Sequence, residues 1–179
     1  MPAPFIVNFH MPIDAQDREV IAELQSMLVE LIDLALIGKQ AHWNVEGPHF
    51  RSLHLELDEL VDTWRTLGDQ VAERAVTLGA VPDGQAATVA SFSQIAPLPV
   101  GHLRDYDVIR EVADRVTQVE ARARARIEVV AGHDPVSDDL LIAVAGTLEK
   151  QLWMLRYNAR TPETRPPPAG RCSGYGVRC

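Results

Sequence analysis

The sequence predicts an all-α protein, built as a four-helix bundle with one long crossover connection. Four segments carry apolar residues at the spacing of an amphipathic helix. The segment between the second and third of these, residues 80–104, is too long for a hairpin between adjacent helices. A single long crossover is an established way to join four packed helices, and 179 residues suit one domain.

The first two helices have clear start and stop signals. Asp14 or Asp17 can cap the start of the first helix, because both lie directly before its apolar pattern. The pair Gly47-Pro48 ends that helix, and a second long helix resumes after it. Gly79 follows the last apolar residue of the second helix and is its expected C-terminal stop.

The last two helices are expected at residues 105–131 and from a Ser137 cap to about Ala159, with a turn at 132–135 between them. The third helix mixes basic and acidic residues, which we interpret as an outer face with ion pairs rather than a nucleic-acid patch. These residues are Arg115, Arg122, Arg124, Arg126, Glu111, Glu120 and Glu128.

Two terminal segments flank the bundle, which is assigned to residues 14–160. Residues 1–13 are expected to form an irregular arm packed on the rest of the protein, and residues 161–179 an irregular tail rich in Pro and Gly. The two cysteines, Cys172 and Cys179, could form a disulfide within or between tails, or stay as thiols. The body then has no disulfide framework, which fits a reducing cytoplasm. No apolar run is long enough to span a membrane, and the start does not resemble a signal peptide.

Four residues of the second helix are spaced as metal ligands would be. His54 and Asp58 are four residues apart, as are Asp69 and Glu73, and all four share one helix face. The two pairs lie roughly 16 Å apart along the axis, whereas metal–ligand bonds are about 2.0–2.2 Å long. One chain therefore cannot bring both pairs to one ion. Either there are two half-sites, or an antiparallel two-fold pairing sets one pair against the other pair of a second subunit.

His42, at the end of the first helix, adds a second imidazole to this set. Two imidazoles with three carboxylates suit Fe(II), Mn(II) or Zn(II) rather than a thiolate site. The alternative is a solvated acidic helix face with ordinary histidines. The shared spacing of five residues favours the metal site.

The same residues carry a resemblance to a known family. The run His42-Trp43-Asn44, a second His twelve residues after the first, an Asp four residues later and a following Asp-x-x-x-Glu-Arg element resemble the Dps family. Dps proteins are small dodecameric members of the ferritin superfamily. The resemblance implies a ferritin-like bundle whose crossover holds a short helix, here at residues 85–91.

The resemblance also implies a function and a division of the ligands. His42, His54 and Asp58 of one subunit would form one half of a ferroxidase site, and Asp69 and Glu73 of its two-fold mate the other half. Such a site binds and oxidises Fe(II), preferentially with hydrogen peroxide. The ferric product is stored as mineral inside a hollow shell, which protects the cell from oxidative damage.

Further residues have roles that the resemblance suggests. Asp134, Asp138 and Asp139 are candidates for a three-fold pore that admits Fe(II), and Asp139 is the best single candidate. The alternative is a favourable interaction of these carboxylates with a helix N-terminus. Trp43 and Trp153 would lie near the iron site and intercept oxidising species, or they are simple core aromatics.

The alternative function is that of a structural nucleoid protein that binds DNA non-specifically through its tails. Several Dps proteins hold DNA through basic tails, and this tail carries Arg165, Arg171 and Arg178. The N-terminal arm has no Lys or Arg before Arg18, and the chain has a formal net charge of −8. A large acidic assembly should repel DNA, so this alternative is not favoured.

Overall fold

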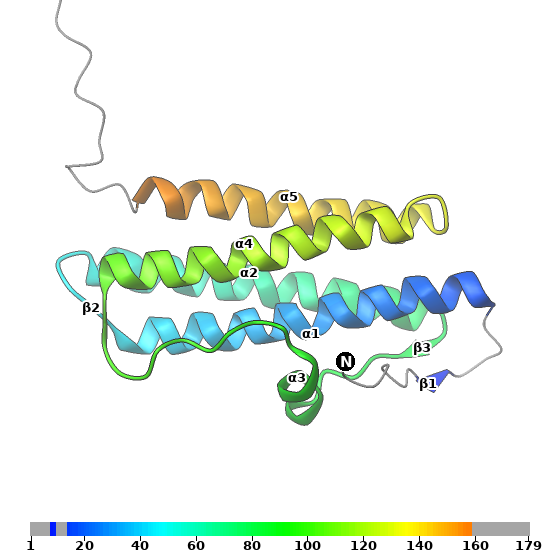
Figure 1. Ribbon diagram of the computed structural model, residues 1–179, viewed down its shortest axis with the longest axis horizontal. Helices are drawn as coiled ribbons and strands as arrows, with labels where there is room; N and C mark the ends of the chain where they lie inside the picture. Colours follow the sequence, from blue (N-terminus) through cyan, green and yellow to red (C-terminus); the bar gives the residue numbers. More distant parts are fainter. Residues whose placement is uncertain (1–7, 10–13, 159–179) are drawn as a thin grey trace, which may run out of the picture.

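The computed structural model describes residues 8–9 and 14–158, and it confirms the predicted bundle (Figure 1). The helices of this part are α1 (Ala15–Asn44), α2 (Phe50–Thr77), α3 (Ala86–Phe92), α4 (Asp105–Val130) and α5 (Pro135–Asn158). Helices α1 and α2 pack together as one pair and α4 and α5 as another, while α3 is the short helix in the crossover. No helix in these ranges is both long and apolar enough to cross a membrane.

Four two-residue strands in the described part of the chain, which the sequence does not signal, hold the connections in place. Strand β1 (Asn8–Phe9) pairs antiparallel with β3 (Ala80–Val81), which follows α2. Strand β2 (Val45–Glu46) pairs in parallel with β4 (Leu103–Arg104). Because β2 follows α1 and β4 precedes α4, this second pair holds both connections at one end of the bundle (Figure 1).

A glycine allows α1 and α2 to approach closely. A Cβ atom added at Gly38 of α1 would lie 2.6 Å from Val61 Cγ2 and 2.7 Å from Trp64 Cζ3, both on α2. Trp64 is completely buried, and its indole N–H donates a hydrogen bond of 2.9 Å to the Gln151 side chain on α5. The largest aromatic side chain of the core therefore occupies the space that the glycine leaves free.

The expectation of an outer face with ion pairs is wrong for two arginines of α4. Arg115 is only 6% exposed and donates hydrogen bonds to the backbone carbonyls of Ala96 and Pro97, at 2.7 and 2.6 Å. Arg126 is 7% exposed and donates to a carboxylate oxygen of Glu30 on α1, at 2.8 Å. These partners come from the crossover and from a buried acid of another helix. The sequence of α4 alone therefore cannot reveal these hydrogen-bond partners.

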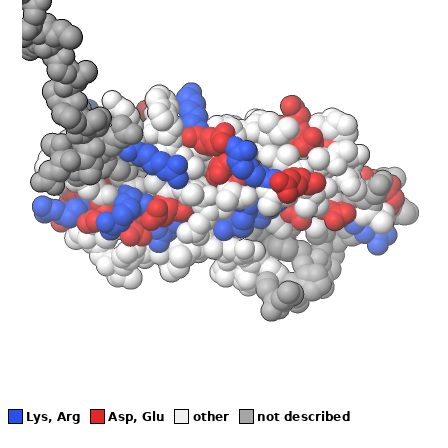
Figure 2. Space-filling model, turned by 45° about the horizontal axis from the view of Figure 1, so that its top comes forward, with Lys and Arg blue, Asp and Glu red and all other residues white. Residues whose placement is uncertain are grey.

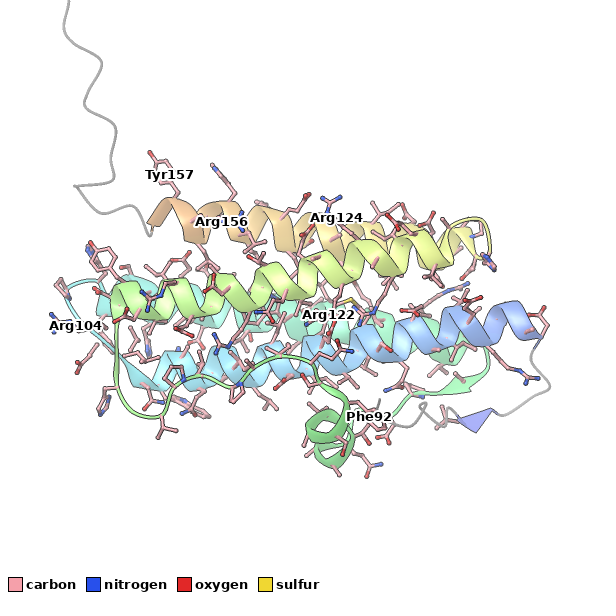
Figure 3. All side chains as sticks on the ribbon, in the orientation of Figure 1. Phe92, Arg104, Arg122, Arg124, Arg156 and Tyr157 are labelled. Atoms are coloured by element: carbon pink, nitrogen blue, oxygen red, sulfur yellow. The ribbon has the colours of Figure 1, made fainter. Side chains whose placement is uncertain are left out.

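Two other arginines of α4 leave the helix in different directions, as Figure 3 shows. Arg122 is directed toward α1, where it also donates to Glu30. Arg124 is half exposed and pairs with Glu120 of its own helix and with Glu149 of α5. The mixed outer face is therefore correct for Arg124, while Arg122 joins the partly buried cluster between α1 and α4.

The start of α5 differs from the expected cap. Asp14 caps α1 as proposed, since its carboxylate accepts the Asp17 N–H at 2.8 Å. Ser137, however, is not the cap of the last helix, because α5 already begins at Pro135. The carboxylate of Asp134 accepts the backbone N–H of Ser137 at 3.2 Å as well as its hydroxyl. Proline suits the first helical position, where no backbone N–H is needed.

Asp134 also forms an ion pair across the bundle. Arg74 Nη2 of α2 lies 2.6 Å from a carboxylate oxygen of Asp134, and both side chains are largely buried. Burial alone raises the pKa of Asp134. The hydrogen bonds from Ser137 and the contact with Arg74 together outweigh burial and hold this pKa below its usual value. The charged form of Asp134 therefore stabilises the folded state.

Replacing Gly38 by Ala should destabilise the protein. The added methyl group must displace Val61 or Trp64, which costs about 1–3 kcal/mol, more than the roughly 1 kcal/mol that Ala gains over Gly in a helix. Gly146→Ala is the matched control. Gly146 lies within α5 with no atom near its added Cβ, so this change should be neutral or stabilising. Denaturant unfolding measures the free energy of unfolding of both variants. A Gly38→Ala protein as stable as Gly146→Ala would contradict this prediction.

Replacing Asp134 by Ala should lower the free energy of unfolding by about 1–3 kcal/mol at neutral pH, because a helix cap and an ion pair are lost together. The depressed pKa of Asp134 adds stability above the ordinary aspartate pKa. This contribution is lost as the pH falls through the folded-state pKa, so the difference from wild type should narrow in acid. Asp139→Ala, at an exposed position, is the control with little expected effect. Denaturant unfolding across a pH series makes the comparison.

Candidate metal centre

The loop between α1 and α2 is fixed by a buried carboxylate at the start of α4. Asp105 is 2% exposed and accepts the backbone N–H groups of His49 and Tyr106, each at 2.9 Å. Gly47 has a φ of +130°, and a Cβ atom there would meet the Asp105 carboxylate at 2.8 Å. The turn that the sequence marks with Gly-Pro thus packs on Asp105, and this sets where α2 begins.

Two histidines meet where α1 ends and α2 begins. The rings of His42 and His54 stack with their centroids 3.6 Å apart and their planes at 24°. Nδ1 of His42 lies 2.9 Å from the backbone carbonyl of His54, and Nδ1 of His54 lies 3.0 Å from the carbonyl of His42. A carbonyl oxygen only accepts hydrogen bonds, so each Nδ1 carries the proton. The lone pair of each imidazole is therefore on Nε2, the atom left to bind a metal.

Asp58 lies next to these histidines and completes a group that can hold a metal ion. One ligand atom from each of His42, His54 and Asp58 lies within 4.8 Å of the others. His42 is buried and the other two are half buried. Two imidazoles and a carboxylate form a mixed nitrogen and oxygen donor set, which suits the iron that the resemblance implies.

Lys39 forms an ion pair with Asp58 through one carboxylate oxygen. The hydrogen bond from Lys39 is the main cause that lowers the pKa of Asp58, so this carboxylate is ionised at neutral pH. Lys39 was not among the site residues predicted from the sequence. The signal was present, because Lys39 lies three residues before His42 and hence on the same face of α1.

Asp69 and Glu73 do not belong to this group. Both are exposed residues of α2, farther along the helix. Asp69 borders a groove of about 370 Å³ between α1 and α2, together with Leu36 and Trp64. The structure thus brings together three of the five proposed ligands, and the other two lie at the surface of the same helix.

Neither of the two tryptophans proposed near the iron site is part of the core. Trp43 is 67% exposed and follows His42 at the end of α1. Trp153 is 66% exposed and borders a hollow between α4 and α5, which Tyr157 also lines. Their interpretation as simple core aromatics is wrong for the isolated chain, where Trp64 is the buried tryptophan.

The three pore candidates differ in their surroundings. Asp134 is engaged by Ser137 and Arg74, as described above. Asp138 is half buried, and one of its carboxylate oxygens has no hydrogen-bond partner among the described residues. Asp139 is exposed and hence the most accessible to a cation.

The remaining candidate residues lie outside the described part of the chain. They are Arg165, Arg171, Arg178, Cys172 and Cys179. Figure 2 shows basic and acidic side chains side by side on the face that it presents, and not gathered in one basic area. This face therefore offers no concentrated positive surface for a polyanion.

Comparison with known proteins agrees with the fold. The ferritin-like domain family matches residues 21–162. The chain is 40% identical over 139 residues to the fine tangled pili major subunit of Haemophilus ducreyi, with 76% of this chain and 73% of that protein covered. It is 37% identical over 151 residues to the DNA protection during starvation protein of Agrobacterium fabrum, with 81% and 90% covered.

A solved structure gives the same result. The crystal structure of Dps92 from Deinococcus radiodurans superimposes with a TM-score of 0.80 at 34% sequence identity, covering 84% of this chain and 92% of that one. These likenesses extend over most of the chain, and the family match runs from within α1 past the end of α5. The protein therefore belongs to the Dps family of ferritin-like proteins.

Proposed function

We propose that the protein is a ferroxidase and iron-storage protein. It oxidises Fe(II), preferentially with hydrogen peroxide, and keeps the ferric product as mineral inside a hollow homo-oligomeric shell of twelve subunits, in the cytoplasm. The observation that carries this proposal is the meeting of His42, His54 and Asp58, with Nδ1 of each histidine within hydrogen-bond distance of the other histidine's backbone carbonyl.

This group is half of a di-iron site, because three protein ligands do not satisfy two ions. Asp69 and Glu73 supply the missing carboxylates from a second subunit, whose α2 runs antiparallel across the first. Their exposure in the single chain leaves them accessible to that subunit. Each two-fold pair then holds two equivalent sites.

The chemistry follows from the donor set. Two Fe(II) ions each give one electron to one hydrogen peroxide molecule, whose O–O bond breaks. Two protons are taken up, and two water molecules and two Fe(III) ions result. The carboxylates of Asp58, Asp69 and Glu73 stabilise Fe(III) more than Fe(II), since hard anionic oxygen prefers the higher charge. Because both electrons are delivered together, no hydroxyl radical needs to be released.

DNA binding is not part of this proposal. The formal net charge of −8 per chain is multiplied in any assembly, and it opposes binding to a polyanion. Some relatives are named for DNA protection, but the negative charge of this chain still opposes DNA binding.

Replacing the ligands on separate chains tests the intersubunit site. Asp69→Ala/Glu73→Ala should slow peroxide-dependent oxidation of Fe(II) strongly, and so should His54→Ala/Asp58→Ala. When subunits of the two variants are mixed and reassembled, half of the pairs contain both, and each of these holds one intact site. Roughly a quarter of the wild-type sites should therefore return. Ferric absorbance after anaerobic loading measures the rate.

Two outcomes would contradict the proposal. Mixed assemblies with no more activity than either parent would exclude a site shared between subunits. A wild-type rate in the Asp69→Ala/Glu73→Ala protein would show that this face of α2 is only a solvated surface.

Replacing Lys39 by Met should tighten the binding of Fe(II) by roughly three- to ten-fold, because the ammonium group no longer competes for Asp58. Lys150→Met, which changes the other lysine of the chain at an exposed position of α5, is the matched control with unchanged affinity. Anaerobic titration with Fe(II) measures both. Weaker binding in Lys39→Met would mean that the lysine supports the site.

A further inference from the structure

A third aromatic ring contacts the pair of histidines at the candidate metal centre. The rings of Phe50 and His54 have their centroids 5.1 Å apart and their planes tilted by 36°. Phe50 is the first residue of α2 and His54 lies four residues later, so both side chains lie on one face of that helix. Since His42 stacks on His54, the rings of Phe50, His54 and His42 follow one another.

Packing of the hydrophobic core does not explain Phe50. This residue is 45% exposed and does not belong to the buried face of α2. An aromatic side chain with so much surface in water gains only part of the free energy that full burial provides. Side chains lean toward the N-terminus of their helix, so His54 leans toward the turn that carries Phe50. The contact with His54 thus accounts for an aromatic residue at a position where burial alone does not.

The fold holds the two histidines with different firmness. His42 is only 7% exposed, whereas His54 is half buried and part of its ring borders solvent. The hydrogen bond of 3.0 Å between His54 Nδ1 and the carbonyl of His42 fixes the position of that nitrogen more closely than the tilt of the ring. Contacts with the ring itself, from His42 and from Phe50, limit the tilt.

The tilt of His54 matters because both imidazoles have to reach one ion. Two ligand atoms at right angles on a metal, with bonds of about 2.0–2.2 Å, are roughly 3 Å apart. The stacked rings of His42 and His54, with centroids 3.6 Å apart, have nearly this spacing. A residue that keeps the rings stacked therefore preorganises them, and less freedom is lost when a metal binds.

The chemistry of phenylalanine suits this role. Its side chain has no ligand atom and no hydrogen-bonding group, so it can orient an imidazole without competing for the metal or for Nδ1. The edge of an aromatic ring is partly positive and its face partly negative, so two tilted rings at this distance attract one another. Lys39 differs in this respect, because its charge competes with a metal ion for Asp58.

We propose that Phe50 is a positioning residue of the iron site. Its ring limits the tilt of the His54 imidazole and keeps it stacked on His42, so that both imidazoles are directed at one ion. The inference rests on the proposed function, because it takes His42, His54 and Asp58 as ligands of iron. Removing the ring of Phe50 should weaken metal binding although every ligand is still present.

The test measures binding of Co(II), a divalent ion with ligand preferences close to those of Fe(II) that stays divalent in air. The full chain with Asp69→Ala/Glu73→Ala is the parent protein, because its site has only the three ligands of one subunit and altered contacts between subunits cannot change that set. Adding Phe50→Leu should raise the Kd for Co(II) by about three- to ten-fold. It should also change the visible absorption of the bound ion, which depends on ligand geometry. Phe50→Tyr keeps the ring and should stay within about two-fold of the parent.

Tyr106→Leu in the same parent is the matched control. Tyr106 is another partly exposed aromatic residue, at 38%, and its ring contacts the ring of His49 edge-on with centroids 5.8 Å apart. His49 is not a proposed ligand, so the loss of this contact should leave the Kd and the Co(II) spectrum unchanged. Circular dichroism checks that each variant keeps its helices, and sedimentation velocity checks that all are compared in the same state of assembly.

Unchanged Co(II) affinity in the Phe50→Leu protein would overturn the inference. An equal loss of affinity in Phe50→Tyr or in Tyr106→Leu would overturn it as well, because the ring at position 50 would then not be the cause. In each of these cases the parent still binds Co(II), so the proposed metal site stands. If neither the parent nor the wild-type protein binds Co(II), the proposed function fails together with the inference.

Discussion

The close contact of α1 with α2 is the constraint on which the site depends. Gly38 allows Val61 and Trp64 to pack against the backbone of α1. His42 lies one helical turn after Gly38, so the same approach brings its ring against His54. A wider spacing would loosen this packing and would also separate the two rings that stack at the candidate metal centre. The packing at Gly38 and the position of the His42 ring one turn away thus depend on the same contact between α1 and α2.

Ion pairs and hydrogen bonds of buried charged side chains also determine how the helices of the bundle pack. Glu30 binds Arg126 and Arg122 where α1 meets α4, and Arg115 holds the crossover through two carbonyls. Such buried pairs gain little net stability over apolar packing, but an unpaired buried charge is strongly unfavourable. These buried pairs therefore restrict how α4 and α5 can pack on α1 and α2. The position of Asp105, and with it the loop before α2, follows from that placement.

The sequence predicted the long helices because their signals are local and repeated. Gly47-Pro48, Gly79 and an apolar residue at nearly every turn specify ends and faces without reference to the rest of the chain. The two-residue strands carry no periodic signal, so they could not be found. The predicted cap of α5 was wrong because Ser137 and Asp134 are both good capping residues. Pro135 at the first helical position and the contact with Arg74, far away in sequence, both favour Asp134.

In the candidate site, too, local spacing predicts some features, while others depend on contacts between distant parts of the chain. Helical spacing identified His54 and Asp58 as neighbours, since four residues make about one turn. It could not show that His42 and His54 exchange hydrogen bonds through their carbonyls, because this depends on the turn between two helices. Lys39 was overlooked because a lysine is ordinary on a helix surface, and only its contact with Asp58, beside the two histidines, gives it significance.

The exchange of hydrogen bonds between the two histidines has a consequence for how the site tolerates change. Each ring is oriented by an atom of the main chain, and the main chain survives the loss of either side chain. Removing one imidazole therefore deletes one donor atom from the candidate site and leaves the other ring oriented as before. The proposed ligand set can be altered one residue at a time, so that geometry and donor type become separately adjustable properties of this scaffold.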